Sequence, residues 1–208
     1  MKVSRTLAAA HRAALLEHGG RLFRRHGIDA VRLADVAREA GLTHGAFYGH
    51  FPSKAALAAE AAGESLESGA LRWRRRAERA RAAGNDPLAA IIGAYLSEAH
   101  RDHPEEGCAL AALGPEVSRA APPLSDALHG GTELLLAVLE DEIAQLDPGG
   151  AAAARRGAAL AMLAAMTGGV ILARALATDP AASRAALDSA ARLARSAAPA
   201  FHQAARTG

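Results

Sequence analysis

The stretch from residue 43 to residue 54 combines hydrogen-bonding side chains with very small ones. Hydroxyl, imidazole and ammonium groups contact phosphate oxygens and base edges in DNA, and small side chains let the backbone approach a groove closely. We expect phosphate contacts from Thr43, Tyr48, His50 and Lys54. We expect base-edge contacts from His44, Gly45 and Ala46, of which Ala46 suits a thymine methyl group.

Two short helices are predicted to position these groups. Apolar residues at three- and four-residue steps indicate the first helix: Leu33, Val36, Ala37 and Ala40. Gly41 is expected to end this helix, and Thr43 to cap a second one that runs to about Gly49. Phe47 and Phe51 are assigned to the core beneath it. The pattern is that of a helix-turn-helix, whose second helix enters the major groove.

Residues 27–57 resemble the DNA-binding domain of the TetR family of bacterial transcriptional regulators. The resemblance is carried by Gly27-Ile28, Asp35-Val36-Ala37, Ala40-Gly41-Leu42-Thr43, Gly45, Phe47-Tyr48, Phe51, Ser53-Lys54 and Leu57. Two positions depart from the family pattern: Arg32 replaces the usual Ser or Thr cap, and His44 replaces a common Lys. These departures bear on which operator is read and how tightly.

The resemblance implies a repressor that binds a palindromic operator in double-stranded DNA as a homodimer. It further implies that the last two helices pair with their two-fold mates, and that a small, mostly apolar effector bound in the second domain releases the DNA. A dimer is also needed because one short recognition helix makes too few base contacts for selective binding. No cofactor is expected.

Composition predicts an all-α, globular chain. Of the 208 residues, 50% are hydrophobic and only 3% aromatic, and the abundant Ala and Leu favour helices. Residues 1–82 carry fifteen Lys or Arg against eight Asp or Glu, whereas residues 83–208 carry nine against fourteen. The charges of +7 and −5 fit a DNA-binding N-terminal part and a different role for the rest.

The chain divides into an N-terminal three-helix DNA-binding domain at 1–54 and a helical regulatory and dimerisation domain at 55–208. A basic arm, residues 1–6, precedes a helix at 7–26, and a linker helix capped by Ser53 spans about 53–81. Further helices are expected at 87–100, 124–146, 151–177 and 180–205. Arg72–Arg76 are expected on a solvated face, with Trp73 anchoring the linker helix to the second domain.

Small residues dominate the last two helices. They are Gly157, Ala161, Ala165, Gly168 and Gly169 on the first, and Ala186, Ala190, Ala194 and Ala197 on the second. Such faces allow helices to approach closely, and they fit either the dimer interface or packing within one chain. Periodicity does not separate the two.

Candidate effector contacts are apolar or adaptable side chains predicted on interior faces: Tyr95, Cys108, Leu110, Leu135, Met162 and Met166. Each is also an ordinary core residue by type. Cys108 follows Gly107 at a predicted helix N-terminus, which favours a thiolate. Some TetR-like repressors with a similar Gly-Cys entry into this helix sense oxidants or electrophiles. The resemblance therefore implies a thiol sensor as the alternative function.

A thiol enzyme using Cys108 and His103 is a remote alternative, because no pattern places a third catalytic group or an oxyanion element. His100 and His103 lack a third metal ligand at motif spacing, so no metal site and no enzyme are predicted. A single cysteine excludes an internal disulfide. The apolar stretch 157–173 is short for a membrane span and is expected to be a buried helix of a soluble, cytoplasmic protein.

Overall fold

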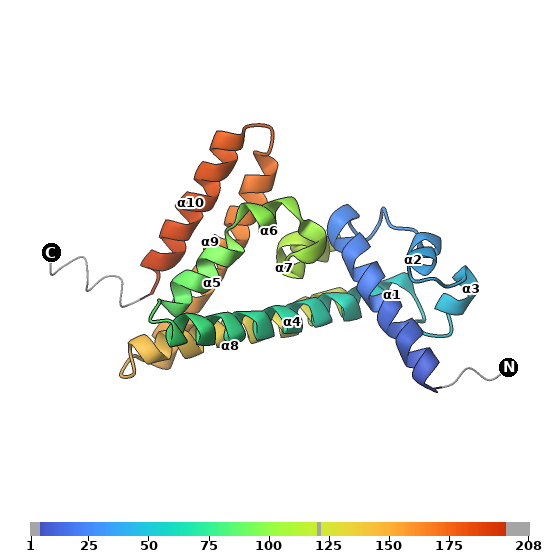
Figure 1. Cartoon of the computed structure of the whole chain (residues 1–208), viewed down its shortest axis with the longest axis horizontal. Coiled ribbons are helices and arrows are strands. Elements are labelled where there is room, and N and C mark those ends of the chain that lie inside the picture. The colour runs from blue at the N-terminus through green and yellow to red at the C-terminus, as the bar shows by residue number, and fades with distance from the viewer. Residues whose placement is uncertain (1–4, 120–121, 199–208) are drawn as a thin grey trace. The chain divides into compact units, whose positions relative to one another are not determined.

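The computed structural model describes residues 5–119 and 122–198, and within these ranges all regular structure is helical (Figure 1). The expected all-α fold is confirmed. The chain forms two compact units: Met1–Leu66 with His103–Gly131, and Glu67–Asp102 with Thr132–Gly208. The expected boundary after residue 54 is a division by function and stays a prediction. By packing, residues 103–131 group with the N-terminal segment.

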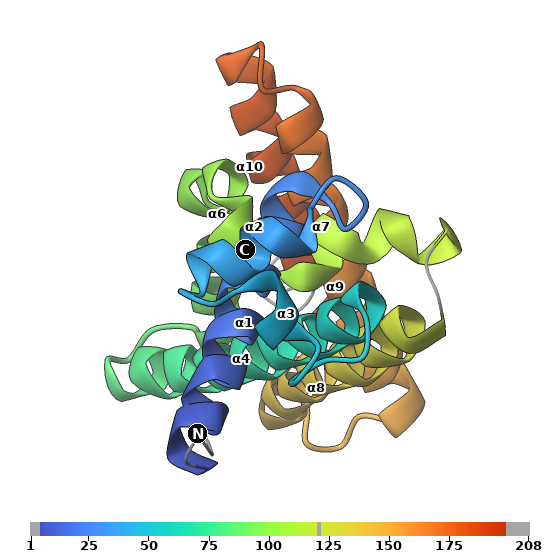
Figure 2. The same cartoon turned by 90° about the vertical axis from the view of Figure 1, so that its right-hand side faces the viewer.

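Unit 1 contains the helix-turn-helix. Its elements are α1 (Arg5–His26), α2 (Leu33–Glu39), α3 (His44–Phe47), the first part of α4 (Lys54–Ala82), η1 (Pro104–Glu106), α7 (Ala109–Leu113), η2 (Gly114–Arg119) and the first part of α8 (Pro122–Leu146). Figure 2 shows α1, α2 and α3 on one side of this unit. Its core includes Leu15, Phe23, Val36, Phe47, Phe51 and Leu57, each at most 2% exposed.

Close approach of α1 to the helix-turn-helix depends on Gly19. A Cβ atom there would collide with the side chain of Leu57 on α4 and press on Val36 of α2. The other end of α1 is fixed to η1, because the guanidinium of Arg24 donates to the carbonyl oxygen of Glu105 at 3.0 and 2.5 Å. Helix α1 thus packs on both α2 and η1.

Unit 2 contains the rest of α4 and α8 with α5 (Pro87–Tyr95), α6 (Glu98–Asp102), α9 (Ala152–Ala175) and α10 (Pro180–Ser196). Asp86 and Asp179 cap α5 and α10, each accepting two backbone N–H groups. Trp73 of α4 is 8% exposed and packs edge-on against Tyr95 at 5.6 Å between ring centroids. The expected anchoring role of Trp73 is therefore confirmed, and Arg72, Arg74, Arg75 and Arg76 are exposed as expected.

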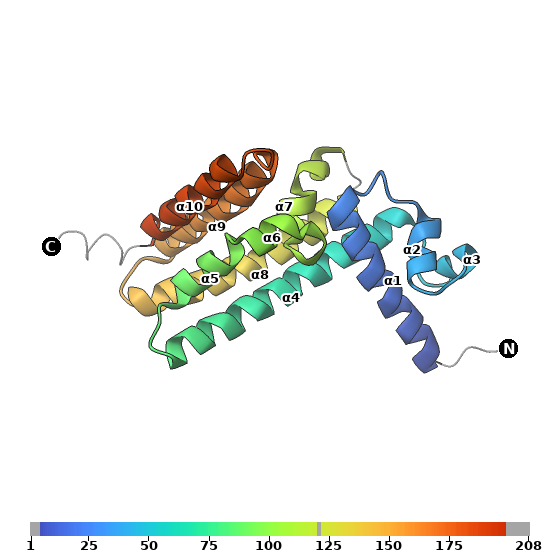
Figure 3. The same cartoon turned by 45° about the horizontal axis from the view of Figure 1, so that its top comes forward.

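Helices α9 and α10 pack side by side (Figures 1 and 3). A Cβ atom at Gly169 would collide with Ala190, so the glycine sets the close approach. Ala186, Ala190 and Ala194 are buried, whereas Gly157, Ala161 and Gly168 on α9 are exposed. The small residues thus divide between packing inside the unit and an open face of α9.

Several helix ends differ from expectation. The helix predicted over 87–100 ends at Tyr95, because Ser97 caps a separate helix, α6, by accepting the His100 N–H at 3.2 Å. Helix α1 begins at Arg5, inside the expected arm, and α8 begins at Pro122, because proline is tolerated in a first turn. Helix α10 ends at Ser196. The arm at 1–4 and residues 199–205 of the last helix lie outside the described residues.

Helix α9 is the described helix that is long and apolar enough to cross a membrane by length and composition. A core helix of a soluble protein passes the same test. Here α9 buries one side in unit 2, through Ala159, Met162, Leu163, Met166, Gly169, Val170 and Ala173.

Candidate nucleic-acid interface

The turn between α2 and α3 has a Schellman geometry. The N–H of Gly41 donates to Arg38 and that of Leu42 to Ala37, at 3.0 and 2.8 Å between nitrogen and oxygen. Gly41 has φ +71° with open space around it, so the glycine is required by the backbone conformation and not by crowding. The expected helix end at Gly41 is confirmed.

Helix α3 is one turn long and is capped by Thr43, whose Oγ1 accepts the Ala46 N–H at 3.3 Å. Tyr48 is its C-cap, and the chain continues as a turn because the His50 N–H donates to Phe47 at 2.9 Å. The helix is thus shorter than the expected span from Thr43 to Gly49. Thr43, His44, Gly45 and Tyr48 are exposed, whereas Ala46 and His50 are half-buried.

A cluster of aromatic rings supports α3 from beneath. Phe47 is fully buried and packs against Phe51 at 5.9 Å between centroids, and Tyr48 stands edge-on to Phe47 at 5.3 Å. Tyr48, 57% exposed, is also edge-on to His44 at 5.6 Å. The exposed groups of α3 therefore stand on a rigid base, which favours a reading surface of fixed shape.

Arg12 ties this base to α1 and α4, a role that the sequence analysis did not find. Its guanidinium lies 4.6 Å from the centre of the Phe51 ring and pairs with both carboxylate oxygens of Glu60 at 2.5 and 2.6 Å. The hydrogen bond to Glu60 raises the pKa of Arg12. A pattern of spacing could not have revealed this triad, because the three residues come from three separate segments.

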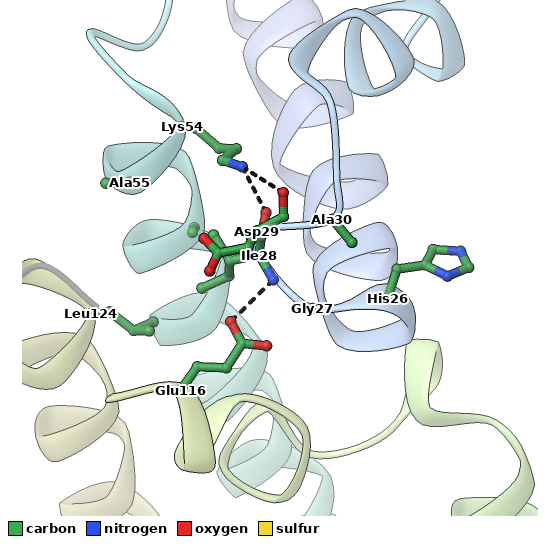
Figure 4. A pocket seen from close by; sticks show the side chains of 10 residues that line it. His26, Gly27, Ile28, Asp29, Ala30, Lys54, Ala55, Glu116 and Leu124 are labelled. Atoms are coloured by element: carbon green, nitrogen blue, oxygen red, sulfur yellow. Dashed lines mark hydrogen bonds between the residues drawn. The ribbon is translucent and has the colours of Figure 1, made fainter. Parts of the chain in front are cut away.

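Lys54 faces the protein's own backbone. Its ammonium donates to the carbonyl oxygens of Ile28, Asp29 and Val31 at 2.8, 3.2 and 3.2 Å, so the three ammonium protons have partners in the loop before α2. Glu116 of η2 holds the same loop, accepting the Ile28 N–H at 3.1 Å (Figure 4). A phosphate contact by Lys54 stays a prediction, and the visible role is to anchor this loop.

These anchors compensate for the missing cap of α2. Arg32 occupies the N-cap position and makes no side-chain cap bond. Ser53 does cap α4 as expected, with its Oγ accepting the Ala56 N–H at 3.1 Å. The loop that leads into α2 is therefore fixed by Lys54 and Glu116 instead of by a residue at the start of the helix.

The six candidate effector contacts fall into both units. Tyr95, Leu135, Met162 and Met166 are buried in unit 2, and the Tyr95 hydroxyl lies 3.4 Å from that of Thr167. Cys108 and Leu110 are half-buried in unit 1. Cys108 is the N-cap of α7, without a side-chain cap bond. The described residues contain no cluster of three or more potential metal ligands.

Residues 15–61 match the sequence profile described as bacterial regulatory proteins, tetR family. No curated protein matches the sequence. Solved structures with a similar fold include NemR of Escherichia coli in its reduced form, with a TM-score of 0.71 at 19% identity, covering 88% of this chain and 97% of that one. The TetR-family regulator of Cytophaga hutchinsonii has a TM-score of 0.71 at 20% identity, covering 94% and 98%.

A putative TetR-family regulator from Rhodococcus sp. has a TM-score of 0.66 at 19% identity, covering 89% of this chain and 98% of that one. At these identities the likeness concerns the fold, and the profile match concerns the segment from the second half of α1 to the start of α4, which contains α2, the turn and α3. Together they agree with the geometry of the helix-turn-helix. Residues 15–61 thus carry the sequence pattern of the tetR family of bacterial regulatory proteins, and the described chain has the fold of solved TetR-family regulators.

Proposed function

We propose that the chain is a ligand-responsive repressor that binds a palindromic operator through α3. The observation that supports this most is the exposure of Thr43, His44, Gly45 and Tyr48 around one helical turn, over the buried Phe47 and Phe51. A short, small helix tip on a rigid base suits the major groove, which is about 12 Å wide.

The two kinds of DNA contact are assigned to different residues. His44 and Gly45 are exposed at the start of α3, and with Ala46 they are proposed to read base edges. Thr43, Tyr48 and His50 are proposed to hold phosphates; Thr43 keeps its hydroxyl proton for donation, because its oxygen is the acceptor in the cap. Lys54 is proposed to have two roles. Its main role is to hold the loop before α2, and a phosphate contact is the second.

We infer a homodimer formed through α9 and α10. Helix α9 leaves an apolar and small-residue stripe exposed, made of Leu160, Ala161, Ala164, Gly168 and Leu172, and α10 exposes Leu193 at 62%. Exposed apolar stripes of this kind on helices favour association with a matching face. Two copies of α3 would then read two half-sites about 34–36 Å apart.

The effector is proposed to be small and mostly apolar, bound in unit 2 near Tyr95, Met162 and Met166. All three are at most 5% exposed, and Tyr95 and Thr167 supply hydroxyls that could orient a ligand. Release of DNA requires differential affinity. A hundredfold rise in operator Kd needs an effector that prefers the non-binding form by about 2.7 kcal/mol.

A thiol sensor is the second candidate, and the position of Cys108 favours it. The residue is the N-cap of α7, which packs on α1 within the unit that contains the helix-turn-helix. A bulky adduct on the sulfur would disturb this packing. A Cys108→Ser protein that still releases DNA in response to the same oxidant would exclude this mechanism.

The family is one of regulatory proteins, and we propose no catalytic activity. His103 pairs with Glu105 at 3.5 Å, and the Nδ1 atom of His100 lies 2.7 Å from the carbonyl oxygen of Tyr95. These contacts give the two histidines structural partners.

A DNA-binding regulator acts where the chromosome is, and we therefore propose a cytoplasmic location.

Selection of bound duplexes from a random pool, followed by gel shift across a salt series, tests the central proposal. We expect an enriched palindrome whose affinity falls as salt rises. His44→Ala is expected to change the preferred sequence, whereas Tyr48→Ala weakens all sequences alike. Failure to retain any duplex at low salt would contradict the proposal.

Light scattering of the purified protein tests the dimer. Leu172→Glu places a charge in the exposed α9 stripe and should yield monomers, whereas Leu146→Glu, at an exposed leucine near the end of α8, should not. Equal masses for the two variants would contradict an interface on α9.

A further inference from the structure

A cavity of about 380 Å³ lies in unit 1, beneath the loop that joins α1 to α2. It is lined by His26, Gly27, Ile28, Asp29, Ala30, Lys54, Ala55, Ala58, Glu116 and Leu124 (Figure 4). The volume is in the range of small-molecule sites. Asp29, Ala30 and Ala55 at its rim are exposed, so a ligand can reach it from solvent.

The floor of the cavity is apolar and leaves room. Ala58 of α4 and Leu124 of α8 are 1% and 3% exposed, and Ile28 adds a half-buried hydrocarbon side chain. Ala55 and Ala58 have small side chains, so this side of α4 leaves space in the cavity. A short hydrocarbon group would remove these surfaces from water, which stabilises binding by about 25 cal/mol for each Å² buried.

The cation of the cavity is already satisfied. All three protons of the Lys54 ammonium have carbonyl acceptors in the loop, at 2.8 to 3.2 Å. Among the described residues, Lys54 forms no ion pair with Asp29 or Glu116. The N-terminus of α4 is also occupied, because Ser53 accepts the Ala56 N–H. An anionic ligand would therefore have to displace existing bonds.

The carboxylates of Glu116 and Asp29 have acceptor positions that can bind a ligand. Glu116 uses one oxygen to accept the Ile28 N–H, and a carboxylate has about four acceptor positions on its two oxygens. Asp29 is at the exposed rim and, among the described residues, neither it nor Glu116 has an ion-pair partner. Two carboxylates and one ammonium give the cavity a net charge of −1 with His26 neutral.

We propose that this cavity binds a small organic cation, a primary amine on a short apolar body. The ammonium donates to Glu116 and Asp29, and the hydrocarbon lies against Ala58 and Leu124. This site goes beyond the proposed effector contacts, because it is built entirely from residues of unit 1, whereas Tyr95, Met162 and Met166 belong to unit 2. Its test requires no DNA.

Calorimetric titration of the full chain with three matched probes tests the charge requirement. The probes are 2-phenylethylammonium, the neutral 2-phenylethanol and the anionic 3-phenylpropionate. We expect the amine to bind at least tenfold more tightly than either of the others. Equal or tighter binding of the alcohol or of the carboxylate would overturn the proposal.

Variants locate the amine in this cavity. Glu116→Gln keeps an oxygen that can accept the Ile28 N–H, and with Asp29→Asn it should weaken amine binding at least fivefold in each case. Glu17→Gln, at an exposed carboxylate of α1 that does not line the cavity, should change it less than twofold. Unchanged affinity in both cavity variants would overturn the site.

Filling the cavity gives an independent result. Ala58→Leu should abolish amine binding, and Ala55→Leu at the exposed rim serves the same purpose if the buried substitution unfolds the protein. Helix content and thermal unfolding identify folded variants. Amine binding that survives in the folded Ala55→Leu protein at wild-type affinity would also overturn the proposal.

Discussion

The ammonium nitrogen of Lys54 lies 2.8 Å from the carbonyl oxygen of Ile28 and 3.2 Å from those of Asp29 and Val31. One side chain at the start of α4 therefore fixes the loop that leads into α2. Because α2 has no side-chain cap of its own, we expect the position of the helix-turn-helix to depend on the contacts of Lys54 and Glu116 with this loop. We therefore expect Lys54 to affect DNA binding through the loop, in addition to any phosphate contact.

Lys54→Met should lower the free energy of unfolding by about 1–2 kcal/mol, because three carbonyls lose a charged donor. It should also weaken binding to all duplexes alike. Arg32→Met is the matched control for the unfolding measurement: it removes a charge from an exposed residue that makes no cap bond. Urea unfolding and a gel-shift salt series measure both effects.

Three outcomes of the Lys54 experiment differ in meaning. A salt slope lower by about one unit indicates that Lys54 contacts a phosphate as well. Weaker binding with an unchanged slope assigns the loss to the loop. A Lys54→Met protein as stable as the Arg32→Met control would contradict the anchoring role.

Gly41 and Gly45 form a matched pair of glycines around the turn. Both have open space at the position of a Cβ atom, but only Gly41 has a positive φ, of +71°. Gly41→Ala should cost about 1–2 kcal/mol of unfolding free energy, because an L side chain disfavours this conformation. Gly45→Ala should leave the stability equal or higher, since alanine favours helix.

Gly45→Ala is expected to affect DNA binding although it does not lower the stability. Gly45→Ala adds a methyl group where the backbone is proposed to approach base edges, so a stable protein should bind its operator less tightly. Thermal unfolding and gel shift on both variants give the comparison. A Gly45→Ala protein with full operator affinity would remove Gly45 from the reading surface.

Local signals made the helix-turn-helix predictable. Gly41, Thr43 and Ser53 act through residues within five positions along the chain, so their caps could be inferred from residue type and spacing. Phe47 and Phe51 lie in the core as predicted, each at most 2% exposed. For the three caps the physical cause is contained in a short segment.

Contacts between distant segments were not predictable from the pattern. Glu116 meets Ile28 across 88 positions, and Arg12 meets Glu60 across 48. Nothing in the neighbourhood of either residue indicates its partner. The prediction of one helix over 87–100 is wrong for a different reason. Ser97 is a local cap signal, but periodicity follows the apolar run before it and does not detect the cap.

Tyr48 offers a test of the phosphate assignment that leaves the fold intact. Its ring is edge-on to His44 and Phe47, and phenylalanine preserves both contacts. Tyr48→Phe should therefore unfold within about 0.5 kcal/mol of wild type, as an exposed substitution does. If its hydroxyl holds a phosphate, the variant should bind all duplexes several-fold less tightly. Equal affinity would remove Tyr48 from the phosphate contacts.

Neighbouring glycines on α9 test the packing of unit 2. Gly169 faces Ala190 and Leu96 with no space for a Cβ atom, whereas Gly168 has nothing within 4 Å. Gly169→Ala should lose about 1–3 kcal/mol by overpacking α9 against α10. Both substitutions are made in the Leu172→Glu background, because Gly168 belongs to the proposed dimer stripe. There Gly168→Ala should be neutral or stabilising in urea unfolding. Equal stability of the two proteins would contradict the close approach of these helices.

His100 gives the stability a dependence on pH. Its Nδ1 lies 2.7 Å from the carbonyl oxygen of Tyr95, and its ring packs edge-on against that of Tyr95 at 4.5 Å between centroids. Burial of the ring lowers the pKa of His100, and nearby Arg174 and Arg72 lower it further, against the effect of the Tyr95 carbonyl. The folded protein therefore keeps this imidazole neutral below the pH at which an exposed histidine gains a proton.

The sign of the effect follows from proton binding. Below about pH 6.5 the unfolded chain protonates His100 and the folded chain does not, so the unfolding free energy falls as the pH falls, until the lowered folded pKa is reached. Each unit of pKa difference contributes about 1.4 kcal/mol. His100→Asn, whose amide can donate to the same carbonyl, should lose less stability between pH 7.5 and 5.5 than wild type.

Urea unfolding at several pH values measures this difference, with His129→Asn as the control at an exposed histidine of α8. The control should follow the wild-type curve, because its ring is in water in both states. Parallel pH curves for wild type and His100→Asn would show that His100 does not destabilise the fold in acid. A steeper curve for His100→Asn would reverse the assigned sign.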